Sequence, residues 1–252
     1  MLAEERRQKI IEKINIEGTV HVSDLSEELD VTEETIRRDL DVLDQKNQLS
    51  RTHGGAVAVE NNSKAELSFN VRENRLKKYK MEIAKKALNL IEEGETIFLD
   101  ASTTAMYLAR ELSSYNNLTV ITNSIKIMLE LIDEDNITVI STGGTLRANS
   151  FSFVGPLANE TVKKYFADKI FASCKGISIQ HGATDSNELE IEVKENMIKQ
   201  AKEIIIIADH CKLNNVGLAK FVEFDQISKI ITDNDADIRE IDKFETAGVK
   251  II

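Results

Sequence analysis

The sequence is poor in cysteine, in proline and in long apolar runs. Cys174 and Cys211 are the only two cysteines among 252 residues, too few for a disulfide framework, so we expect a reducing compartment. Pro156 is the single proline, and 42% hydrophobic with 30% charged residues indicates an ordered globular protein. No apolar run approaches the roughly 18 to 20 residues of a membrane span. Because the N-terminus is charged from its fourth residue, we expect a cytoplasmic protein with no membrane partner.

Several motifs of cofactor, metal and catalytic sites are also missing. The chain contains no G-x-G-x-x-G, no Walker loop, no C-x2-C or H-x3-H spacing and no G-x-S-x-G, which argues against nucleotide cofactors, zinc and hydrolase chemistry. His210 and Cys211 are neighbours at a predicted strand end and should point to opposite faces, so one metal ion rarely takes both. The sequence therefore predicts no cofactor, no metal and no catalytic residue.

The charge balance restricts how the chain could bind nucleic acid. The net charge is -11 and the pI is near 5.0, whereas contacts to phosphate need lysine and arginine. Residues 1–60 are net acidic, and the stretch 61–87 is net basic. Any contact to DNA must therefore be made by a few well-placed cations.

Three helices are predicted near the N-terminus. Residues 4–16 carry isoleucines at helical spacing, and Gly18 should end this helix. Ser23 is the expected N-cap of a short second helix, and Thr32 that of a longer third helix. The third helix has an inward-facing apolar stripe of Ile36, Leu40 and Leu43, so Thr35, Arg37 and Arg38 lie off that stripe.

A hairpin follows the third helix. In "QLSRTHGGAVAV", residues 48–59, Gly54 and Gly55 separate two short extended runs, as in a two-stranded turn. Three helices and a hairpin together predict a winged helix-turn-helix domain, whose third helix enters the major groove of DNA. We expect this domain to end at residue 58 and a linker to cover 59–75.

The remainder, residues 76–252, has the pattern of an α/β domain. A basic helix begins near Leu76, and short β-rich runs alternate with helical segments from residue 94 onward, which predicts a parallel sheet with helices on its faces. The expected strands are "ETIFLD", "LTVITN", "ITVIST", "KIFASC", "EIIIIAD", "SKIITD" and "GVKII".

These segments resemble a known family. The run "TEETIRRDLDVLDQKNQLSRTHGGAV" is similar to the N-terminal signature of the DeoR family of bacterial transcriptional regulators, and the rest of the chain resembles that family's sugar-phosphate sensor domain. The resemblance covers essentially the whole chain. It implies a sensor domain similar to ribose-5-phosphate isomerase, operator DNA and a phosphorylated sugar as partners, and a homo-oligomer, either a dimer or a tetramer.

The expected DNA contacts come from the third helix and the wing. An arginine side chain can grip guanine O6 and N7 with two hydrogen bonds, and threonine can reach a phosphate or a base edge. The alternatives are surface ion pairs for Arg37 and Arg38, with partners such as Glu34 or Asp41, and a turn-stabilising role for His53. The candidate residues are Ser23, Thr32, Glu33, Thr35, Arg37, Arg38, Arg51, Thr52 and His53.

The expected effector site lies at the carboxyl ends of the strands. In "FLDASTTAMYL" a strand ends at Asp100 and a helix opens near Thr103, so backbone N–H groups and hydroxyls could bind a phosphate there, although simple capping is an alternative. Polar strand ends converge in an open parallel sheet. From these ends we expect contributions from Asp100, Ser102, Thr103, Thr104, Thr122, Asn123, Gly143, Gly144 and Arg147.

Three further positions follow from the resemblance to the family. It implies that Lys175, Glu190 and Lys212 join Asp100 in lining the sugar pocket. Lys175 departs from the family pattern, because "CKGIS" offers a lysine where many members have a small neutral residue. Glu190 and Lys194 could equally form a pair on the helix surface.

We expect a repressor of a carbohydrate-utilisation operon that a phosphorylated sugar or polyol releases from DNA, and no enzyme activity. One alternative is a sugar-phosphate isomerase with a DNA-binding appendage, which shares the crevice but needs a carboxylate base at the reacting carbons. A second alternative is a DNA-bridging protein that has no effector.

Overall fold

The computed structural model describes residues 2–17, 19–46, 48–52, 54–57 and 67–252. The chain divides into two compact units, Met1–Lys77 and Lys78–Ile252. Gly18 and His53, both named in the sequence analysis, lie outside the described residues. Within those described residues, no helix has both the length and the apolar character that a membrane crossing requires.

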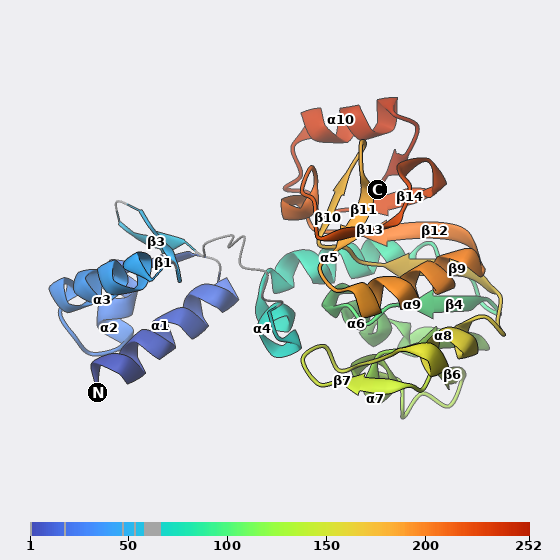
Figure 1. Ribbon diagram of the computed structural model, residues 1–252, viewed down its shortest axis with the longest axis horizontal. Helices are drawn as coiled ribbons and strands as arrows, with labels where there is room; N and C mark the ends of the chain where they lie inside the picture. The colour runs from blue at the N-terminus through green and yellow to red at the C-terminus, as the bar shows by residue number, and fades with distance from the viewer. Residues whose placement is uncertain (1, 18, 47, 53, 58–66) are drawn as a thin grey trace. The chain divides into compact units, whose positions relative to one another are not determined.

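The N-terminal unit is a winged helix-turn-helix fold, as the sequence predicted (Figure 1). Its helices are α1 (Ala3–Glu17), α2 (Val22–Glu28) and α3 (Glu33–Gln45), and its sheet has the order β1-β3-β2, with β1 (Thr19–His21), β2 (Ser50–Arg51) and β3 (Gly55–Val57). All strand pairs in this sheet are antiparallel. One apolar core joins the elements: Ile10, Ile14, Val20, Val22, Leu25, Leu29, Ile36, Leu40, Leu43, Leu49 and Ala56.

A glycine lets the wing pack closely against β1. Gly55 pairs with His21 across the sheet, and a Cβ atom at Gly55 would lie 1.9 Å from the carbonyl oxygen of Val20. Only glycine avoids that overlap of atoms. The second glycine of "THGG" is therefore required by the packing of β3, in addition to any role in the turn.

The expected N-cap of the second helix is wrong. α2 begins at Val22 and follows His21, and no side chain caps it. Val22 is buried in the core, and its backbone N–H donates to the carbonyl of Gly54 in the wing at 2.9 Å. The wing therefore satisfies the first N–H of the helix, so Ser23 falls inside the first turn, where its Oγ donates to Asp24 Oδ1 at 2.9 Å.

A short helix lies within the segment expected to be a linker. α4 spans Phe69–Asn74 and contacts α1 within the N-terminal unit. Phe69 is fully buried, and the guanidinium of Arg72 lies 5.6 Å from the centre of its ring. Residues 59–66 of the expected linker lie outside the described residues.

The second unit is built on a seven-stranded parallel sheet with the order β15-β14-β12-β9-β4-β5-β6. Five strands fall within the segments that the sequence predicted, and β9 and β12 overlap theirs but begin two residues earlier, so the α/β class is confirmed (Figure 1). The strands are β4 (Thr96–Leu99), β5 (Leu118–Thr122), β6 (Ile137–Ser141), β9 (Ala167–Ala172), β12 (Ala201–Ile207), β14 (Lys229–Ile231) and β15 (Lys250–Ile251).

Helices follow most of these strands. The helices are α5 (Lys77–Leu88), α6 (Thr103–Arg110), α7 (Ile125–Glu130), α8 (Pro156–Val162), α9 (Glu188–Lys199) and α10 (Ile238–Thr246), with short 3-10 turns η1 (Leu112–Ser114), η2 (His210–Lys212) and η3 (Phe224–Gln226). Pro156 stands at the start of α8, where a missing N–H costs nothing. The single proline thus marks a helix start.

Two small sheets were not predicted. β7 (Thr145–Arg147) and β8 (Ser152–Val154) form an antiparallel hairpin. β10 (Gly176–Ser178), β11 (Gly182–Asp185) and β13 (Ala219–Val222) form a second antiparallel sheet. Both follow strands of the parallel sheet along the chain, so they supply side chains near its carboxyl edge.

The strand order reverses between β4 and β9. From β4 the chain extends the sheet through β5 and β6 on one side, and then returns to β9, β12, β14 and β15 on the other. Ligands of open α/β sheets bind at such a switch point, outside the carboxyl ends of the strands. The residues that follow β4 and β9 are therefore candidates for a ligand-binding site.

Candidate functional site

Helix α3 presents its polar face as the sequence predicted. Thr32 caps the helix, since its Oγ1 accepts from Thr35 N at 3.3 Å and lies 2.9 Å from the hydroxyl of Thr35. Ile36, Leu40 and Leu43 are buried on the opposite face. The capped helix and its inward stripe are thus confirmed.

Arg37 and Arg38 both pair with glutamates one turn earlier on α3. Arg37 Nη2 donates to Glu33 Oε2 at 2.6 Å, and Arg38 Nε donates to Glu34 Oε1 at 3.3 Å. The arginine side chains are 49% and 77% exposed. Exposed pairs at this spacing contribute only about 0.3 to 0.5 kcal/mol. An external anion could therefore replace either glutamate at little cost.

Asp39 is a buried carboxylate that sequence reasoning missed. It lies on the apolar side of α3 and accepts from Arg6 Nε at 2.5 Å and from Arg7 Nε at 2.7 Å. These two hydrogen bonds attach α1 to the buried side of α3, away from its exposed arginines. The signal was available in the sequence, because Asp39 stands three residues after Ile36 and four before Leu43, on the buried stripe.

The wing arginine is held by its own domain. Arg51 Nε lies 3.0 Å from Asp41 Oδ1, and its Nη1 donates to the carbonyl of Gly55 at 3.3 Å. The backbone N–H of Thr52 also donates to Gly55 O, at 3.0 Å, which closes the turn. Arg51 therefore joins the wing to α3. His53 lies outside the described residues.

A buried ion cluster marks the switch point of the parallel sheet. Asp100 follows β4, and its Oδ2 accepts from the backbone N–H of Ser173, which follows β9, at 2.9 Å. Lys194 on α9 reaches the same oxygen at 3.0 Å, and it also donates to Asp185 Oδ2 and to Ser173 O at 2.5 and 2.6 Å. Lys212 Nζ donates to Ser173 Oγ at 2.9 Å. The cluster therefore holds four charged side chains, those of Asp100, Asp185, Lys194 and Lys212.

The buried lysine of this cluster stays charged. Burial acts to lower the pKa of Lys194, but the carboxylates of Asp185 and Asp100 outweigh it, so the pKa is raised above its usual value. The ammonium also lies 5.0 Å from the ring centre of Phe221. A buried lysine with two carboxylate partners is a positive centre that is fixed in place.

A second cluster forms around Glu190, one turn before Lys194 on α9. Glu190 Oε1 accepts from Arg147 Nη1 at 2.6 Å, from Ser150 Oγ at 2.8 Å and from Ser152 Oγ. Its Oε2 accepts from Asn123 Nδ2 at 3.5 Å. The hairpin β7–β8 and the end of β5 are thereby tied to α9.

The alternative of a surface pair between Glu190 and Lys194 is wrong. The two residues are only 7% and 6% exposed, and each bonds to a different cluster. The reason is tertiary, because α9 packs this face against strand ends and not against water.

The start of α6 is capped by a side chain, which was one of the alternatives that the sequence left open. Ser102 Oγ accepts from Ala105 N at 3.1 Å. Thr103 and Thr104 are buried, and Thr104 Oγ1 has no hydrogen-bond partner in the structure. Capping by Ser102 thus coexists with a buried hydroxyl that an additional group could engage.

Buried polar atoms without partners gather along this edge. They belong to Thr104, Asn123, Asp209 and Thr232, which follow β4, β5, β12 and β14 respectively. They are four of the seven such side-chain atoms among the described residues. Each buried polar atom without a partner costs about 1 to 3 kcal/mol. A bound molecule with hydroxyl and anionic groups would supply the missing hydrogen bonds.

The remaining candidates differ in how they contribute. Thr122 Oγ1 accepts from Ser124 N at 3.1 Å. Gly143 and Gly144 adopt positive φ angles, and a Cβ on Gly144 would lie 2.7 Å from Val154 O. Lys175 is exposed, and among the described residues no polar partner of its side chain is present. The structure thus gathers most of the predicted residues at one edge and leaves Lys175 outside the ion clusters.

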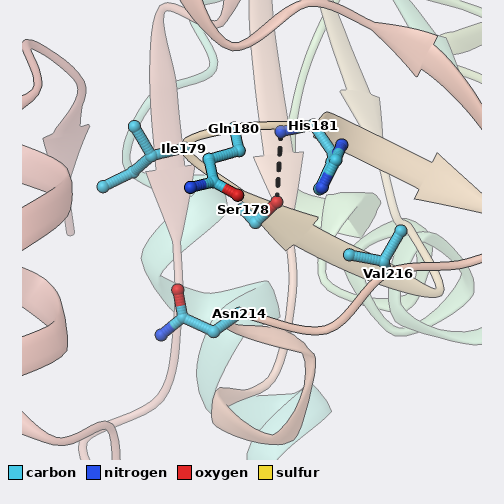
Figure 2. A pocket seen from close by; sticks show the side chains of 6 residues that line it. All are labelled: Ser178, Ile179, Gln180, His181, Asn214 and Val216. Carbon is cyan, nitrogen blue, oxygen red and sulfur yellow. Dashed lines mark hydrogen bonds between the residues drawn. The ribbon is translucent and has the colours of Figure 1, made fainter.

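A pocket lies away from these clusters. Its volume is about 380 Å³, and its wall includes the turn between β10 and β11. Ser178 Oγ accepts there from His181 N at 3.2 Å, and Figure 2 draws this hydrogen bond among the lining residues. Its lining residues are Ser178, Ile179, Gln180, His181, Asn214 and Val216. None of them was predicted as an effector residue.

Within the described part of the chain, no group of three His, Cys, Asp or Glu side chains is arranged to hold a metal ion.

A winged helix with exposed arginines, followed by an α/β unit with a polar switch point, defines a DNA-binding regulator with a ligand-sensing domain. Residues 6–62 match the DeoR-like helix-turn-helix domain, and residues 76–234 match the DeoR C-terminal sensor domain. The chain belongs to the DeoR family of transcriptional regulators, with the sugar-phosphate sensor domain of that family.

Relatives match over nearly their whole lengths. The chain is 42% identical over 251 residues to the uncharacterized HTH-type transcriptional regulator YulB of Bacillus subtilis, covering 100% of this chain and 96% of that protein. It is 35% identical over 229 residues to the L-fucose operon activator of Escherichia coli (90% and 94%). It is 32% identical over 252 residues to the HTH-type transcriptional repressor GlcR of Bacillus subtilis (100% and 96%).

One solved structure similar to part of the chain is ribose 5-phosphate isomerase A from Methanocaldococcus jannaschii, with a TM-score of 0.39 and 17% identity, covering 53% of each chain. The relatives that match over the full length are named as regulators. The protein is therefore a regulator and not an enzyme, as the sequence analysis expected.

Proposed function

We propose that this protein represses a carbohydrate-utilisation operon and that a phosphorylated sugar or polyol relieves the repression. In this proposal residues 1–58 bind operator DNA, and residues 76–252 bind the effector. Relatives carry the names of both an activator and a repressor. The sign of regulation is therefore part of the proposal, together with a homodimer or tetramer that matches paired half-sites of an operator in the cytoplasm.

The proposed DNA contacts lie on the exposed face of α3 and on the wing. The pairs of Arg37 and Arg38 with glutamates are exposed and weak, which favours their exchange for guanine and phosphate. Because adjacent helical residues point about 100° apart, one arginine contacts bases and the other the backbone. Thr32, Glu33, Thr35, Ser23, Arg51, Thr52 and His53 would complete the surface.

The proposed effector site is the carboxyl edge of the parallel sheet. The observation that carries it is the set of buried polar atoms without partners on residues that follow four of the strands. The phosphate would bind at the start of α6, where N–H groups and the Thr104 hydroxyl face an anion favourably. Sugar hydroxyls would bind Asp100, Asn123, Glu190 and Lys212, next to Arg147 and the Gly143–Gly144 turn.

The effector would act by preferring one conformation. Only a ligand with different affinities for two states shifts their equilibrium. The effector must therefore bind better to a conformation or assembly that fits the operator poorly. A compound that binds both states equally well would leave DNA binding unchanged.

The full-length protein offers a direct test. Its thermal unfolding would be measured with aldose, ketose and polyol phosphates, with the unphosphorylated counterparts, and with inorganic phosphate. At a concentration 100 times Kd the true effector adds about 2.7 kcal/mol, a rise in Tm of roughly 5 to 10 °C. An operator selected from random DNA would then be used in binding assays, and the same compound should release it. Binding to DNA that no compound changes would favour a DNA-bridging protein and overturn the proposal.

A further inference from the structure

Three side chains outside the ion clusters stand in a hydrogen-bonded line. His210 and Cys211 lie in η2, directly after β12, and Asp233 lies after β14. Cys211 Sγ is 3.2 Å from His210 Nε2, and His210 Nδ1 is 2.8 Å from Asp233 Oδ1. Thiol, imidazole and carboxylate therefore follow one another, as in cysteine nucleophiles that are activated by a histidine base.

The carboxylate determines which nitrogen of the imidazole carries the proton. The Asp233 side chain is completely buried, and it accepts from the backbone N–H groups of His210 and Asp235 at 2.8 and 3.1 Å. Its Oδ1 can only accept from the ring, so Nδ1 carries the proton. Nε2 then presents its lone pair to the thiol.

The ring is held in place from a second side. Tyr79 lies edge-on to His210 with ring centres 4.9 Å apart, and its hydroxyl donates to Asp235 Oδ2 at 2.6 Å. His210 is 27% exposed in its side chain, and Cys211 is partly exposed. The base is therefore oriented, and the cysteine beside it is partly exposed.

The surroundings offer further polar groups. Asp209 Oδ1 and Thr232 Oγ1 are buried atoms without partners, and they belong to the residues that immediately precede His210 and Asp233. This observation is independent of the bonds within the line of three. It shows that hydrogen-bonding capacity remains unused at the ends of β12 and β14, on the residues that precede His210 and Asp233 in the chain.

The other cysteine provides a contrast. Cys174 is 5% exposed, and burial raises the pKa of its thiol to about 12. At neutral pH it is a protonated thiol, which is a poor nucleophile. The chain thus holds one partly exposed thiol beside a base and one buried thiol as an internal reference.

We propose that Cys211, His210 and Asp233 form an activated-thiol site that reacts with hydroperoxides. His210 Nε2 takes the proton of Cys211, and Asp233 stabilises the imidazolium. The thiolate sulfur attacks the nearer peroxide oxygen, an S–O bond forms and the O–O bond breaks. With hydrogen peroxide the departing hydroxide takes the proton from the imidazolium and leaves as water, and with an organic hydroperoxide the departing alkoxide takes it and leaves as an alcohol. Sulfur is oxidised by two electrons to sulfenic acid and the peroxide is reduced by the same two.

The test uses the full-length protein, hydrogen peroxide and a dione probe that traps sulfenic acid, with intact mass and peptide mapping. Cys211 should be trapped and Cys174 should not. Cys174→Ser should keep the reaction, and Cys211→Ser should lose it. Trapping of Cys174 before Cys211 would overturn the proposal.

The role of the base is tested by alkylation with iodoacetamide at pH 7. His210→Gln keeps the backbone N–H that Asp233 accepts but removes the base, so the rate at Cys211 should fall about tenfold. Asp233→Asn, which no longer fixes the proton on Nδ1, should also slow the reaction. Circular dichroism establishes that both variants are folded. Equal rates in the parent and in either folded variant would show that Cys211 is an ordinary surface thiol.

Discussion

Lys194 Nζ lies 3.0 Å from Asp100 Oδ2, and this contact joins helix α9 to the carboxyl end of β4 at the switch point of the sheet. Both side chains are buried. Because a charge left without its partner in the interior is costly, the contact is a sensitive point for the stability of the sensor unit.

We expect Lys194→Met to destabilise the sensor unit by about 3 to 5 kcal/mol, since Asp100 and Asp185 would remain buried without a cation. Thermal and urea unfolding measure this loss. Lys199→Met on the same helix is the matched control, because Lys199 is 68% exposed and its carboxylate partner is 4.0 Å away. The control should change stability by less than about 0.5 kcal/mol. Equal losses in the two variants would contradict the importance of the buried cluster.

The pH dependence of the same variant follows from the raised pKa of Lys194. A raised folded-state pKa means that the stabilisation is fully present below the ordinary lysine value of about 10.4, and is lost only as pH rises through the higher folded value. The difference in unfolding free energy between the parent and Lys194→Met should therefore stay constant from about pH 6 to about pH 9. A difference that shrinks across this range would contradict the direction of the shift.

Asp39→Asn should loosen the attachment of α1 to α3. Arg6 is buried and would lose its carboxylate partner, at a cost of about 3 to 5 kcal/mol to the N-terminal unit. The rates of hydrogen exchange of the backbone amides of α1 and α3 measure this loss of stability. Asp41→Asn is the control, since Asp41 is 57% exposed and pairs only at the surface with Arg51. Exchange that is unchanged in Asp39→Asn would show that these two hydrogen bonds of Asp39 contribute little.

Arg37→Ala should abolish binding to a specific operator while the sensor unit stays folded. Loss of a bidentate contact to guanine removes discrimination between bases. Arg38→Ala should instead weaken binding to all DNA sequences alike. It should also lower, by about one, the slope of the logarithm of the binding constant against the logarithm of the salt concentration. Arg239→Ala removes the same charge from a side chain that is 82% exposed in the sensor unit, and it should bind as the parent does. Specificity that persists in Arg37→Ala would mean that another residue contacts the bases.

Ser102→Asp should block the response to the effector. Aspartate can still cap α6, so the helix keeps its start, but its charge would repel a phosphate at the same N-terminus. Ser102→Asn caps without charge and is the matched control. In thermal-shift assays the phosphorylated effector should stabilise the asparagine variant and not the aspartate variant. A normal shift in Ser102→Asp would place the phosphate elsewhere.

Tyr79 should ionise at a higher pH than an ordinary tyrosine. Its hydrogen bond to Asp235 raises the pKa of Tyr79 to about 12, against an ordinary value of about 10. The hydroxyl should thus remain a donor throughout the neutral range. In an absorbance titration of the four tyrosines, the step near pH 12 should be absent from Tyr79→Phe. A titration that is the same in both proteins would remove Asp235 as the cause.

The framework could be predicted from the sequence because its signals are local. Buried strands such as "EIIIIAD" and the capped helix after Thr32 carry their patterns within a few neighbouring residues. The small sheets could not be found in this way, because strands of three or four residues bounded by glycine show no clear alternation. In the structure their strands contact helices α8 and α9, which are distant in the sequence from part of each sheet.

The site was predictable at the strand ends and not beyond them. Asp100 and Asn123 could be found because parallel strands place their ends together. Ser150, Ser152 and Ser173 could not, since a serine has no signal of its own until the fold brings Glu190 or Lys212 near it. The start of α2 was misplaced for the same reason, because its first N–H is satisfied by Gly54, far along the chain.

Helix α9 holds both ion clusters, through Glu190 and through Lys194 one turn later. A rigid helix cannot release one of these side chains from its strand ends without shifting the other. Under the proposed function, inorganic phosphate or a free sugar would each disturb only one part of the two ion clusters. The hydrogen bonds of the other part would then keep α9 in place. We therefore expect the sensor to work as a coincidence detector, which responds when both chemical ends of one compound are present together.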